Sequence, residues 1–234
     1  MTDVFYFKKF NVKQSSSVFK IGTDSVLLGA YINCESAKYI LDIGCGSGVI
    51  SLILAQKSIA NIHALDINIE ACNLAKENFK NSKWADRLKV FCKAVQNFDT
   101  KIKYDIIVSN PPYFTSGNPS PKKAKAIAKH DLELDLKDLL LGINRFLSED
   151  GKAYIIYPAL QEDYFVKECK NLDLFISEKL FIIPKKGKQA KRIIFEIVRK
   201  PSKFEISHLT IENDFRHDYS QEYRELTKKY YLNF

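Results

Sequence analysis

Short apolar runs alternate with longer amphipathic segments along most of this chain. The apolar runs are typical of buried strands, and the segments between them repeat apolar residues at helical spacing, as at Ile69, Cys72 and Phe79. The pattern predicts strands at 39–43, 61–66, 87–92, 104–109 and 152–158, and helices at 48–57, 69–80, 134–147 and 161–171. Alternating strands and helices form a parallel sheet covered by helices on both faces.

The last third of the chain departs from this alternation. Two further strand candidates, 175–183 and 191–199, follow each other through the basic turn Pro184–Gly187 and indicate a hairpin. The helix at 134–147 is expected to stop at the turn Ser148–Gly151. We therefore expect an α/β fold with a mostly parallel, seven-stranded sheet, an antiparallel edge hairpin and helices on both faces.

The segments outside the alternating pattern are short. We expect an N-terminal extension at 1–36, a core at 37–200 and a C-terminal extension at 201–234 that contains a short helix. The tail repeats apolar or aromatic residues on one helix face at Tyr219, Tyr223, Leu226 and Tyr230. Core packing is favoured over RNA stacking for this face.

Composition narrows the class of protein. The chain has 234 residues, 46% of them hydrophobic, which suits one globular α/β domain. No apolar run approaches the ~20 residues that span a bilayer, and the first residues lack the layout of a signal peptide. The sequence therefore predicts a cytoplasmic protein without a membrane partner, and nothing in it indicates an obligate protein partner.

The cysteines and histidines do not indicate a metal site. None of the five cysteines forms a CxxC pair, and the four histidines show no metal-like spacing. We expect reduced, mostly buried thiols and no metal.

The net charge of +8 is a pointer to an anionic partner, although a solvated lysine-rich surface gives the same total. Clustering is more informative. Lysines gather near the N-terminus, after the strand at 104–109, and around the predicted hairpin turn.

A glycine-rich turn follows the first strand of the alternating pattern. Gly44, Gly46 and Gly48 join this strand to a helix, a geometry that lets backbone amides approach a small polar cofactor. Val49 stands where a dinucleotide fingerprint requires glycine, which disfavours NAD. A plain strand-to-helix turn is the alternative.

Two carboxylates accompany this turn. Asp66 ends the next strand, 22 residues after Gly44, where a carboxylate can accept both hydroxyl protons of a ribose. Asp42 precedes the glycines. It orients the loop, holds the cofactor's amino group through water, or is satisfied by loop amides.

An amide, two prolines and an aromatic ring follow the strand at 104–109, in the order Asn110, Pro111, Pro112 and Tyr113. The Asn110 side-chain oxygen and the Pro111 carbonyl can accept the two N–H bonds of a planar amino group, while Tyr113 stacks on its ring. An Asn-Pro β-turn is the alternative. Together with the glycine turn, these residues suggest methyl transfer from S-adenosylmethionine to a planar nitrogen.

These motifs resemble the class I S-adenosylmethionine-dependent methyltransferases, which have a Rossmann-like fold. More narrowly, the whole chain resembles the bacterial family that N6-methylates the anticodon-adjacent adenosine of valine tRNA. The core motifs are widely shared. The more specific stretches are 10–14, 19–30, 219–227 and 230–234.

The resemblance implies an enzyme that uses S-adenosylmethionine, with the valine tRNA anticodon loop as its partner. It implies catalytic roles for Asn110, Pro111 and Tyr113. The implied cofactor-binding set is Thr23, Asp42, Gly44, Gly46, Asp66, Ile67, Ala94, Val95 and Asn110. Lysines that hold flanking phosphates would be Lys122, Lys123, Lys125, Lys185, Lys186, Lys188 and Lys191.

Two members of the cofactor set need comment. The resemblance implies that the N-terminal extension 1–36 packs on the cofactor site. Thr23 is expected near the methionine moiety, where Gly22–Asp24 caps a helix that begins near Ser25. Many methyltransferases carry an acid where this chain has Ala94 and Val95. Backbone amides there, or Gln96, would have to read the cofactor's adenine instead.

Other functions remain open from the sequence. A protein glutamine side chain or the N2 amino group of ribosomal RNA guanine presents the same chemical problem to Asn110. A non-enzymatic RNA-binding module on the same fold is a further alternative.

Overall fold

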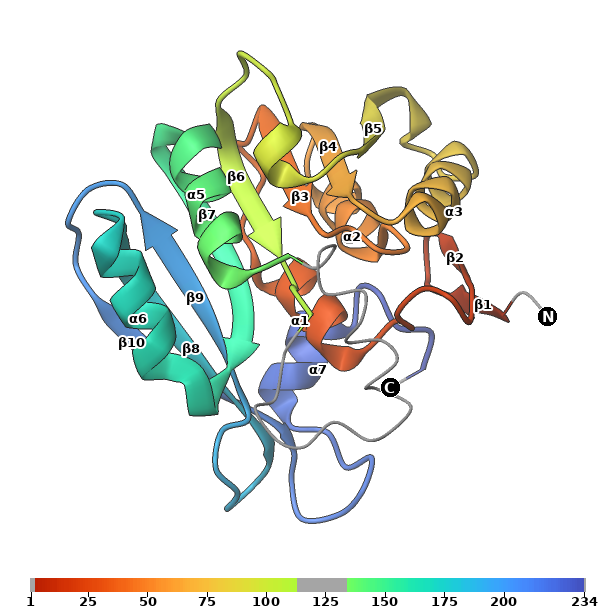
Figure 1. Cartoon of the computed structure of the whole chain (residues 1–234). Coiled ribbons are helices and arrows are strands. Elements are labelled where there is room, and N and C mark those ends of the chain that lie inside the picture. Colours follow the sequence, from red (N-terminus) through yellow and green to blue (C-terminus); the bar gives the residue numbers. More distant parts are fainter. Residues whose placement is uncertain (1–2, 113–133, 234) are drawn as a thin grey trace, which may run out of the picture.

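One large sheet forms the centre of the molecule, and helices cover both of its faces (Figure 1). The computed structural model describes residues 3–112 and 134–233. Within them the main sheet has eight strands in the order β10-β8-β9-β7-β6-β3-β4-β5. Only β9 in this sheet runs antiparallel to its neighbours. The predicted Rossmann-like α/β fold and its antiparallel hairpin are confirmed.

The strands of this sheet are β3 (Tyr39–Ile43), β4 (Asn61–Asp66), β5 (Leu88–Cys92), β6 (Tyr104–Ser109), β7 (Leu147–Pro158), β8 (Phe175–Lys185), β9 (Arg192–Val198) and β10 (Glu205–Glu212). A separate antiparallel pair consists of β1 (Asp3–Tyr6) and β2 (Asn11–Gln14). The helices are α1 (Thr23–Tyr31), α2 (Val49–Lys57), α3 (Ile69–Lys80), α5 (Leu136–Phe146), α6 (Glu162–Asn171) and α7 (Gln221–Thr227). Short 3₁₀ turns are η1 (Ala85–Arg87), η2 (Val95–Asn97) and η4 (Ala159–Gln161).

Local sequence signals account for the best-defined helix. The Asn68 side chain accepts hydrogen bonds from the backbone amides of Glu70 and Ala71, at 2.8 and 3.3 Å, and so caps α3. Such a cap satisfies amides that have no partner within the helix. The inward face of α3 then buries Ala75 and Phe79 against the sheet.

The sheet separates two hydrophobic cores. One contains side chains from α1, α2, α3 and α7, and the other contains side chains from α5 and α6. Every residue of α2 from Val49 to Ala55 is buried, because this helix packs between the sheet and α1. Burial on both faces explains the unbroken apolar runs of β3 and β4.

The C-terminal extension adds a strand that was not expected. β10 pairs in parallel with β8, Glu205 facing Glu178 and Glu212 facing Lys185. Its alternating polar and apolar residues suit an edge strand with one face against the core. The sheet therefore has one strand more than the seven predicted.

The turn predicted at Ser148–Gly151 is wrong. These residues continue β7, and a register irregularity opposite Tyr104 and Ile106 absorbs the extra length. Leu147 pairs with Tyr104 and Lys152 pairs with Ile106, so the four polar residues between them bulge out of the β6–β7 ladder while the strand continues on both sides.

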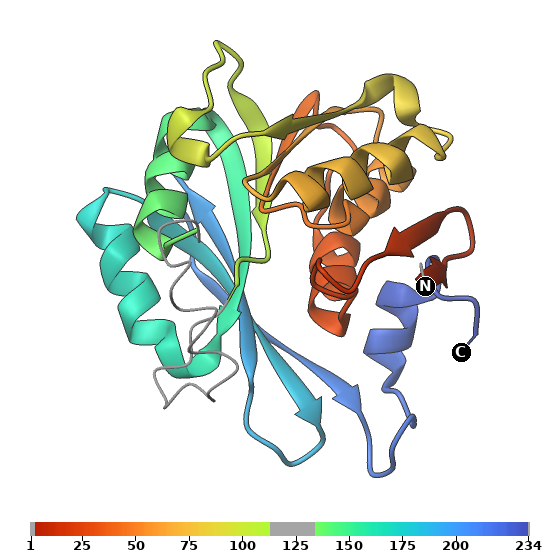
Figure 2. The same ribbon diagram turned by 45° about the vertical axis from the view of Figure 1, so that its right-hand side comes forward.

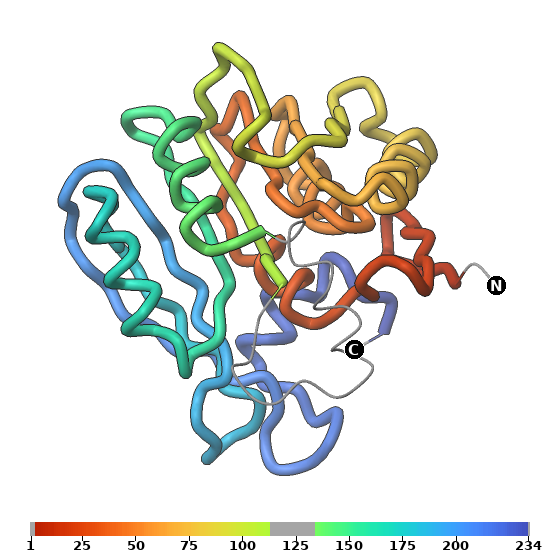
Figure 3. Tube along the Cα trace, in the orientation of Figure 1, coloured from red at the N-terminus to blue at the C-terminus, as the bar shows by residue number. Residues whose placement is uncertain are grey.

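The two ends of the chain meet (Figure 3). The Lys8 amide donates to the Tyr230 carbonyl at 2.8 Å, and the Phe7 and Tyr231 rings stack with centroids 6.2 Å apart. Tyr223 and Tyr230 are each 3% exposed and belong to the core beside α1, which confirms core packing for the tail.

No helix in residues 3–112 and 134–233 combines the length and apolar character needed to cross a membrane.

Replacement of Gly48 by alanine should destabilise the protein more than replacement of Gly187. Both glycines have left-handed φ angles, +80° and +76°. A Cβ at Gly48 would lie 2.5 Å from the Phe79 ring, whereas none of the described atoms lies within 4 Å of one at Gly187. We expect losses of about 2–4 kcal/mol for Gly48→Ala and about 1–2 kcal/mol for Gly187→Ala, measured by denaturant unfolding. Equal losses would show that Phe79 moves aside without cost.

Candidate functional site

Hydrogen bonds tie together the carboxyl ends of three neighbouring strands. The Ser109 hydroxyl, at the end of β6, donates to the Ile43 carbonyl of β3 at 2.7 Å. The amides of Gly44 and Cys45 both donate to the Leu65 carbonyl of β4, at 2.8 and 2.9 Å. The residues that follow these strands therefore share one rim of the sheet, where ligands collect in open α/β folds.

The glycine turn uses three left-handed residues. Gly44, Gly46 and Gly48 have φ angles of +75°, +53° and +80°, which side chains adopt only at a cost. Beside Gly44 and Gly46 there is space. Among the described atoms, the nearest to an added Cβ would be a Leu134 carbon at 3.8 Å and a Val18 carbon at 3.9 Å. The backbone of the turn is thus accessible to a small ligand.

Asp66 holds the turn from the next strand. One carboxylate oxygen accepts from the Gly46 amide at 2.8 Å, and the other accepts from the Asn68 amide at 2.9 Å. A carboxylate oxygen can accept more than one hydrogen bond. Asp66 therefore remains suited to a vicinal diol while it supports the turn.

Asp42 lies below the turn and is fully buried. Its Oδ2 accepts from the Ser51 hydroxyl and amide, at 2.7 and 3.2 Å, so these donors come from α2 and not from the glycine turn. Its Oδ1 has no hydrogen-bond partner within residues 3–112 and 134–233. Burial raises the pKa of Asp42 to about 7, and the two Ser51 hydrogen bonds oppose this rise.

The remaining residues of the predicted cofactor set differ in how far their side chains are exposed to a ligand. Ile67 follows Asp66 and is 44% exposed, so its apolar side chain is available at the rim. Ala94 precedes η2 and is half-buried, while Val95 is buried and packs against Gly142 of α5. Val95 can therefore serve a ligand only through its backbone.

Asn110 follows β6 directly and contacts the first turn of α1. Its Nδ2 atom donates to the Ser25 hydroxyl at 2.9 Å. Pro111 is buried and Pro112 is half-buried, whereas Tyr113 lies outside the described residues. The contact with Ser25 places the Nδ2 end of the Asn110 amide against α1.

The start of α1 differs from the prediction. The helix begins at Thr23 rather than near Ser25, and Gly22 caps it without a side-chain hydrogen bond. Thr23 therefore lies in the first helical turn, two residues before the serine that holds Asn110. Asp24 in the same turn pairs with Arg192 at 2.9 Å.

The contact of Ser25 with Asn110 and the ion pair of Asp24 with Arg192 were not predicted from the sequence. No local signal marks these contacts, because the partners are separated by 85 and 168 residues along the chain. Together they place the first turn of α1 between Asn110 and the hairpin formed by β8 and β9.

The predicted phosphate-binding lysines fall into two groups. Lys186, Lys188 and Lys191 are exposed at the turn between β8 and β9, and Lys185 is half-buried at the end of β8. Lys122, Lys123 and Lys125 lie outside the described residues. Among the residues that are described, no three His, Cys, Asp or Glu side chains gather as a metal site.

Comparison with known proteins shows that the chain is similar to methyltransferases. The model of the family described as "Methyltransferase small domain" matches residues 9–156. The tRNA1(Val) (adenine(37)-N6)-methyltransferase of Phocaeicola vulgatus is 41% identical over 98% of this chain and 97% of its own. The protein of the same name from Trichodesmium erythraeum is 38% identical over 98% of each chain.

Solved structures show the fold. A predicted O-methyltransferase from Agrobacterium tumefaciens has a TM-score of 0.66 at 15% identity and covers 88% of this chain and 96% of its own. A S-adenosylmethionine-dependent methyltransferase from Clostridium acetobutylicum has a TM-score of 0.54 at 15% identity, over 78% and 94%.

The Asp42→Asn variant should gain stability over the parent protein as the pH rises. The folded-state pKa of about 7 exceeds the ordinary value of 3.8, so the folded protein binds this proton more tightly. The stability that the proton contributes is complete below the ordinary pKa and is lost as the pH rises through about 7. Between pH 5 and 8 the difference in unfolding free energy should grow by about 2–3 kcal/mol in favour of the variant.

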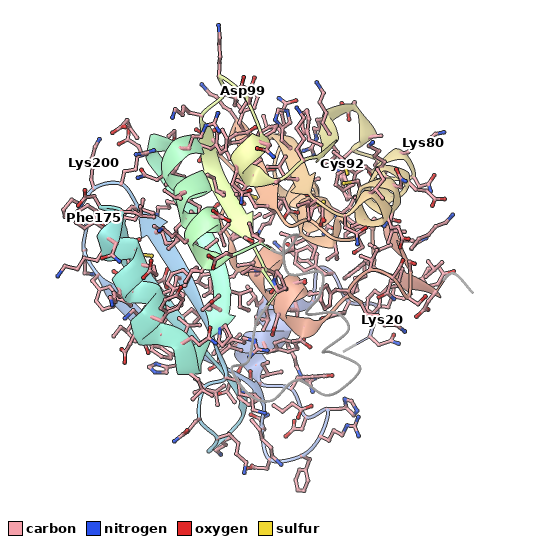
Figure 4. The ribbon with its side chains drawn as sticks, viewed as in Figure 1. Lys20, Lys80, Cys92, Asp99, Phe175 and Lys200 are labelled. Atoms are coloured by element: carbon pink, nitrogen blue, oxygen red, sulfur yellow. The ribbon has the colours of Figure 1, made fainter. Side chains whose placement is uncertain are left out.

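Denaturant unfolding at several pH values measures this difference. The exposed Asp99→Asn variant is the control for a simple change of net charge (Figure 4). A difference for Asp42→Asn that stays flat over the range would show that Asp42 is ionised throughout.

Proposed function

Since the chain belongs to the tRNA1(Val) (adenine(37)-N6)-methyltransferase family, we propose that it methylates the exocyclic N6 of the anticodon-adjacent adenosine in valine tRNA. The observation that carries the site assignment is the contact of Asn110 with Ser25, on the same rim as the glycine turn and Asp66. An amide on this rim can face an acceptor base and a cofactor together.

The residues on the rim fit S-adenosylmethionine. Asp66 is suited to accept hydrogen bonds from the ribose hydroxyls. The accessible backbone at Gly44 and Gly46 is suited to the polar methionine chain, and the exposed Ile67 side chain is suited to the flat adenine ring. The buried Oδ1 of Asp42, unpartnered among the described residues, fits a water or amino group next to the turn. Thr23, Asn110 and the backbone of Ala94 and Val95 complete the proposed set.

S-adenosylmethionine, when bound, supplies an electrophilic methyl group on a sulfonium centre. The protein's task is to prepare the acceptor. The lone pair of an adenine amino group is delocalised into the ring, so this nitrogen is a poor nucleophile. Two acceptors aimed at its N–H bonds favour a more pyramidal and more reactive nitrogen.

In this proposal the two acceptors are the Asn110 side-chain oxygen and the Pro111 carbonyl. Ser25 accepts from the Nδ2 end of the amide, and the proposal assigns the oxygen end to the base. The ring geometry of Pro111 and Pro112 stiffens the backbone that carries both acceptors. Tyr113 stacks on the base, and the surplus proton passes to solvent after transfer.

The choice of tRNA rests on the family. A protein glutamine and ribosomal RNA guanine present similar nitrogens, but the relatives that match this chain over nearly its full length are named for tRNA. The base next to the anticodon is unpaired, so it enters a site at lower cost than a base in a duplex. The basic side chains at the β8–β9 turn suit its flanking phosphates.

Replacement of Asn110 by alanine should lower turnover by ~10²-fold or more at saturating cofactor and tRNA, since one oriented acceptor is lost. Asp66→Ala should mainly raise the cofactor dissociation constant. Transfer of labelled methyl to valine tRNA measures the first effect, and calorimetry measures the second. Asn171→Ala, an exposed position at the end of α6, is the matched control.

Unchanged turnover in Asn110→Ala would refute the transfer site. Label that enters ribosomal RNA or protein, but not tRNA, would refute the substrate. Tight RNA binding without any cofactor affinity would favour the non-enzymatic alternative. Nucleoside analysis of tRNA from a strain lacking the protein tests the same assignment in the cell.

Charge reversal at Lys185 and Lys186 should weaken tRNA binding and flatten its dependence on salt. Each lost phosphate contact lowers the slope of log K against log salt by ~0.7–0.9. Lys200→Glu, at the other end of the sheet, is the control (Figure 4). A slope that stays unchanged in the double variant would remove these lysines from the interface.

A further inference from the structure

An aromatic ring projects from the C-terminal extension on the rim that carries the lysines. Phe215 is 74% exposed, although rings of this size are usually buried. Its chain neighbours Asp214 and Arg216 are charged and exposed, so charged side chains flank the ring along the chain. A single exposed ring needs further support before it indicates a function.

That support begins with the backbone around it. The loop at 213–218, here called the Phe215 loop, has a paired stem. The Ser220 amide donates to the Ile211 carbonyl at 2.9 Å, and the Asn213 amide donates to the Asp218 carbonyl at 2.7 Å. A bridge between Glu212 and Tyr219 lies between these two bonds.

The tip of the loop is also held in a fixed conformation. His217 adopts a left-handed φ of +66°, and its amide donates to the Glu212 carboxylate at 2.9 Å. A non-glycine residue in this region costs ~1 kcal/mol or more, so its neighbours must enforce the conformation. Phe215 is therefore presented to solvent by an ordered loop.

The Phe215 loop lies against the lysine turn. The Lys186 amide donates to the Glu212 carbonyl at 2.9 Å, and the Lys186 ammonium lies 4.0 Å from the Asp214 carboxylate. Residues 184–192 carry five cationic side chains and no acidic one. Figure 2 shows the two loops side by side beyond the same end of the sheet. The ring thus stands beside a strongly cationic turn.

Both loops lie at the rim that carries Asn110. β6, β7, β8 and β10 run in one direction, so Ser109, Pro158, Lys185 and Glu212 end at a common edge. Four strand spacings separate β6 from β10, which amounts to ~20 Å. Arg192 connects the lysine turn to Asp24 of α1, one residue before the partner of Asn110.

An exposed ring on an ordered loop beside a cationic turn matches single-stranded RNA. Cations hold the phosphates, and the ring stacks on an unpaired base. A protein partner would instead require a wider apolar surface than one ring between charged neighbours provides. The combination therefore favours the anticodon loop as the occupant.

We propose that the Phe215 loop and the lysine turn form one docking surface for the anticodon arm of tRNA, on which Phe215 stacks against an unpaired base. This inference rests on the proposed function and deepens it. In this proposal the C-terminal extension binds the tRNA, while methyl transfer takes place at the rim beside Asn110.

The test compares Phe215 variants of the full chain in binding to a valine tRNA transcript, followed by fluorescence anisotropy. Phe215→Ala should raise the dissociation constant about tenfold, and Phe215→Trp should keep it within about twofold. In the latter variant, tRNA should quench the added tryptophan fluorescence. Turnover at saturating tRNA and cofactor affinity should stay unchanged in both.

Phe175→Ala is the matched control, because this ring is 38% exposed at the opposite end of β8 (Figure 4). Unchanged tRNA affinity in Phe215→Ala, while the parent protein methylates valine tRNA, would overturn this inference alone. A parent protein that neither binds nor methylates this tRNA would overturn the proposed function and the inference with it. Reduced cofactor affinity or melting temperature in Phe215→Ala would show that the ring is structural and overturn the inference.

Discussion

The hydrogen bonds between the glycine turn and the end of β4 are the constraint on which the rest of the site depends. The Leu65 carbonyl receives two amides of the turn, and the Asp66 carboxylate receives a third from Gly46. These bonds require left-handed backbone at the glycines, and the contact of Gly48 with Phe79 leaves no room for a side chain there. The turn therefore keeps one shape, which fixes the start of α2 and the direction of Asp66.

The buried carboxyl group of Asp42, below the glycine turn, is only partly hydrogen-bonded within the described residues. A carboxylate without solvent is stable only when its neighbours compensate for lost hydration, and Ser51 serves one of its two oxygens. Folded proteins retain such incompletely satisfied groups chiefly where function needs them. In the proposed cofactor site, a polar group bound at the turn would supply the missing partner of the Asp42 Oδ1 atom.

The first turn of α1 connects the proposed transfer site with the proposed tRNA surface. Ser25 holds Asn110, and Asp24 holds Arg192 at the base of the lysine turn. Both residues lie in the first turn of one helix. The proposed transfer site and the proposed tRNA surface are in this way joined by two direct contacts to one helix.

The sequence by itself determined the elements whose signals are local. The bounds of β4 and α3 agree with the prediction, because an apolar run ends at Asp66 and Asn68 caps the helix. The glycine turn, Asp66 and Asn110 were predicted on one rim because the carboxyl ends of parallel strands must share an edge.

Only the tertiary structure decided the features that depend on distant partners. The residues Ser148–Gly151 have the composition of a turn but lie within β7, as a bulge between Leu147 and Lys152, which pair with Tyr104 and Ile106 of β6. The polar residues of β10 give no strand signal in the sequence, and they form a strand because they pair with the edge strand β8. The contacts of Ser25 with Asn110 and of Asp24 with Arg192 join residues far apart along the chain, and such pairs leave no periodic or local signal in a single sequence.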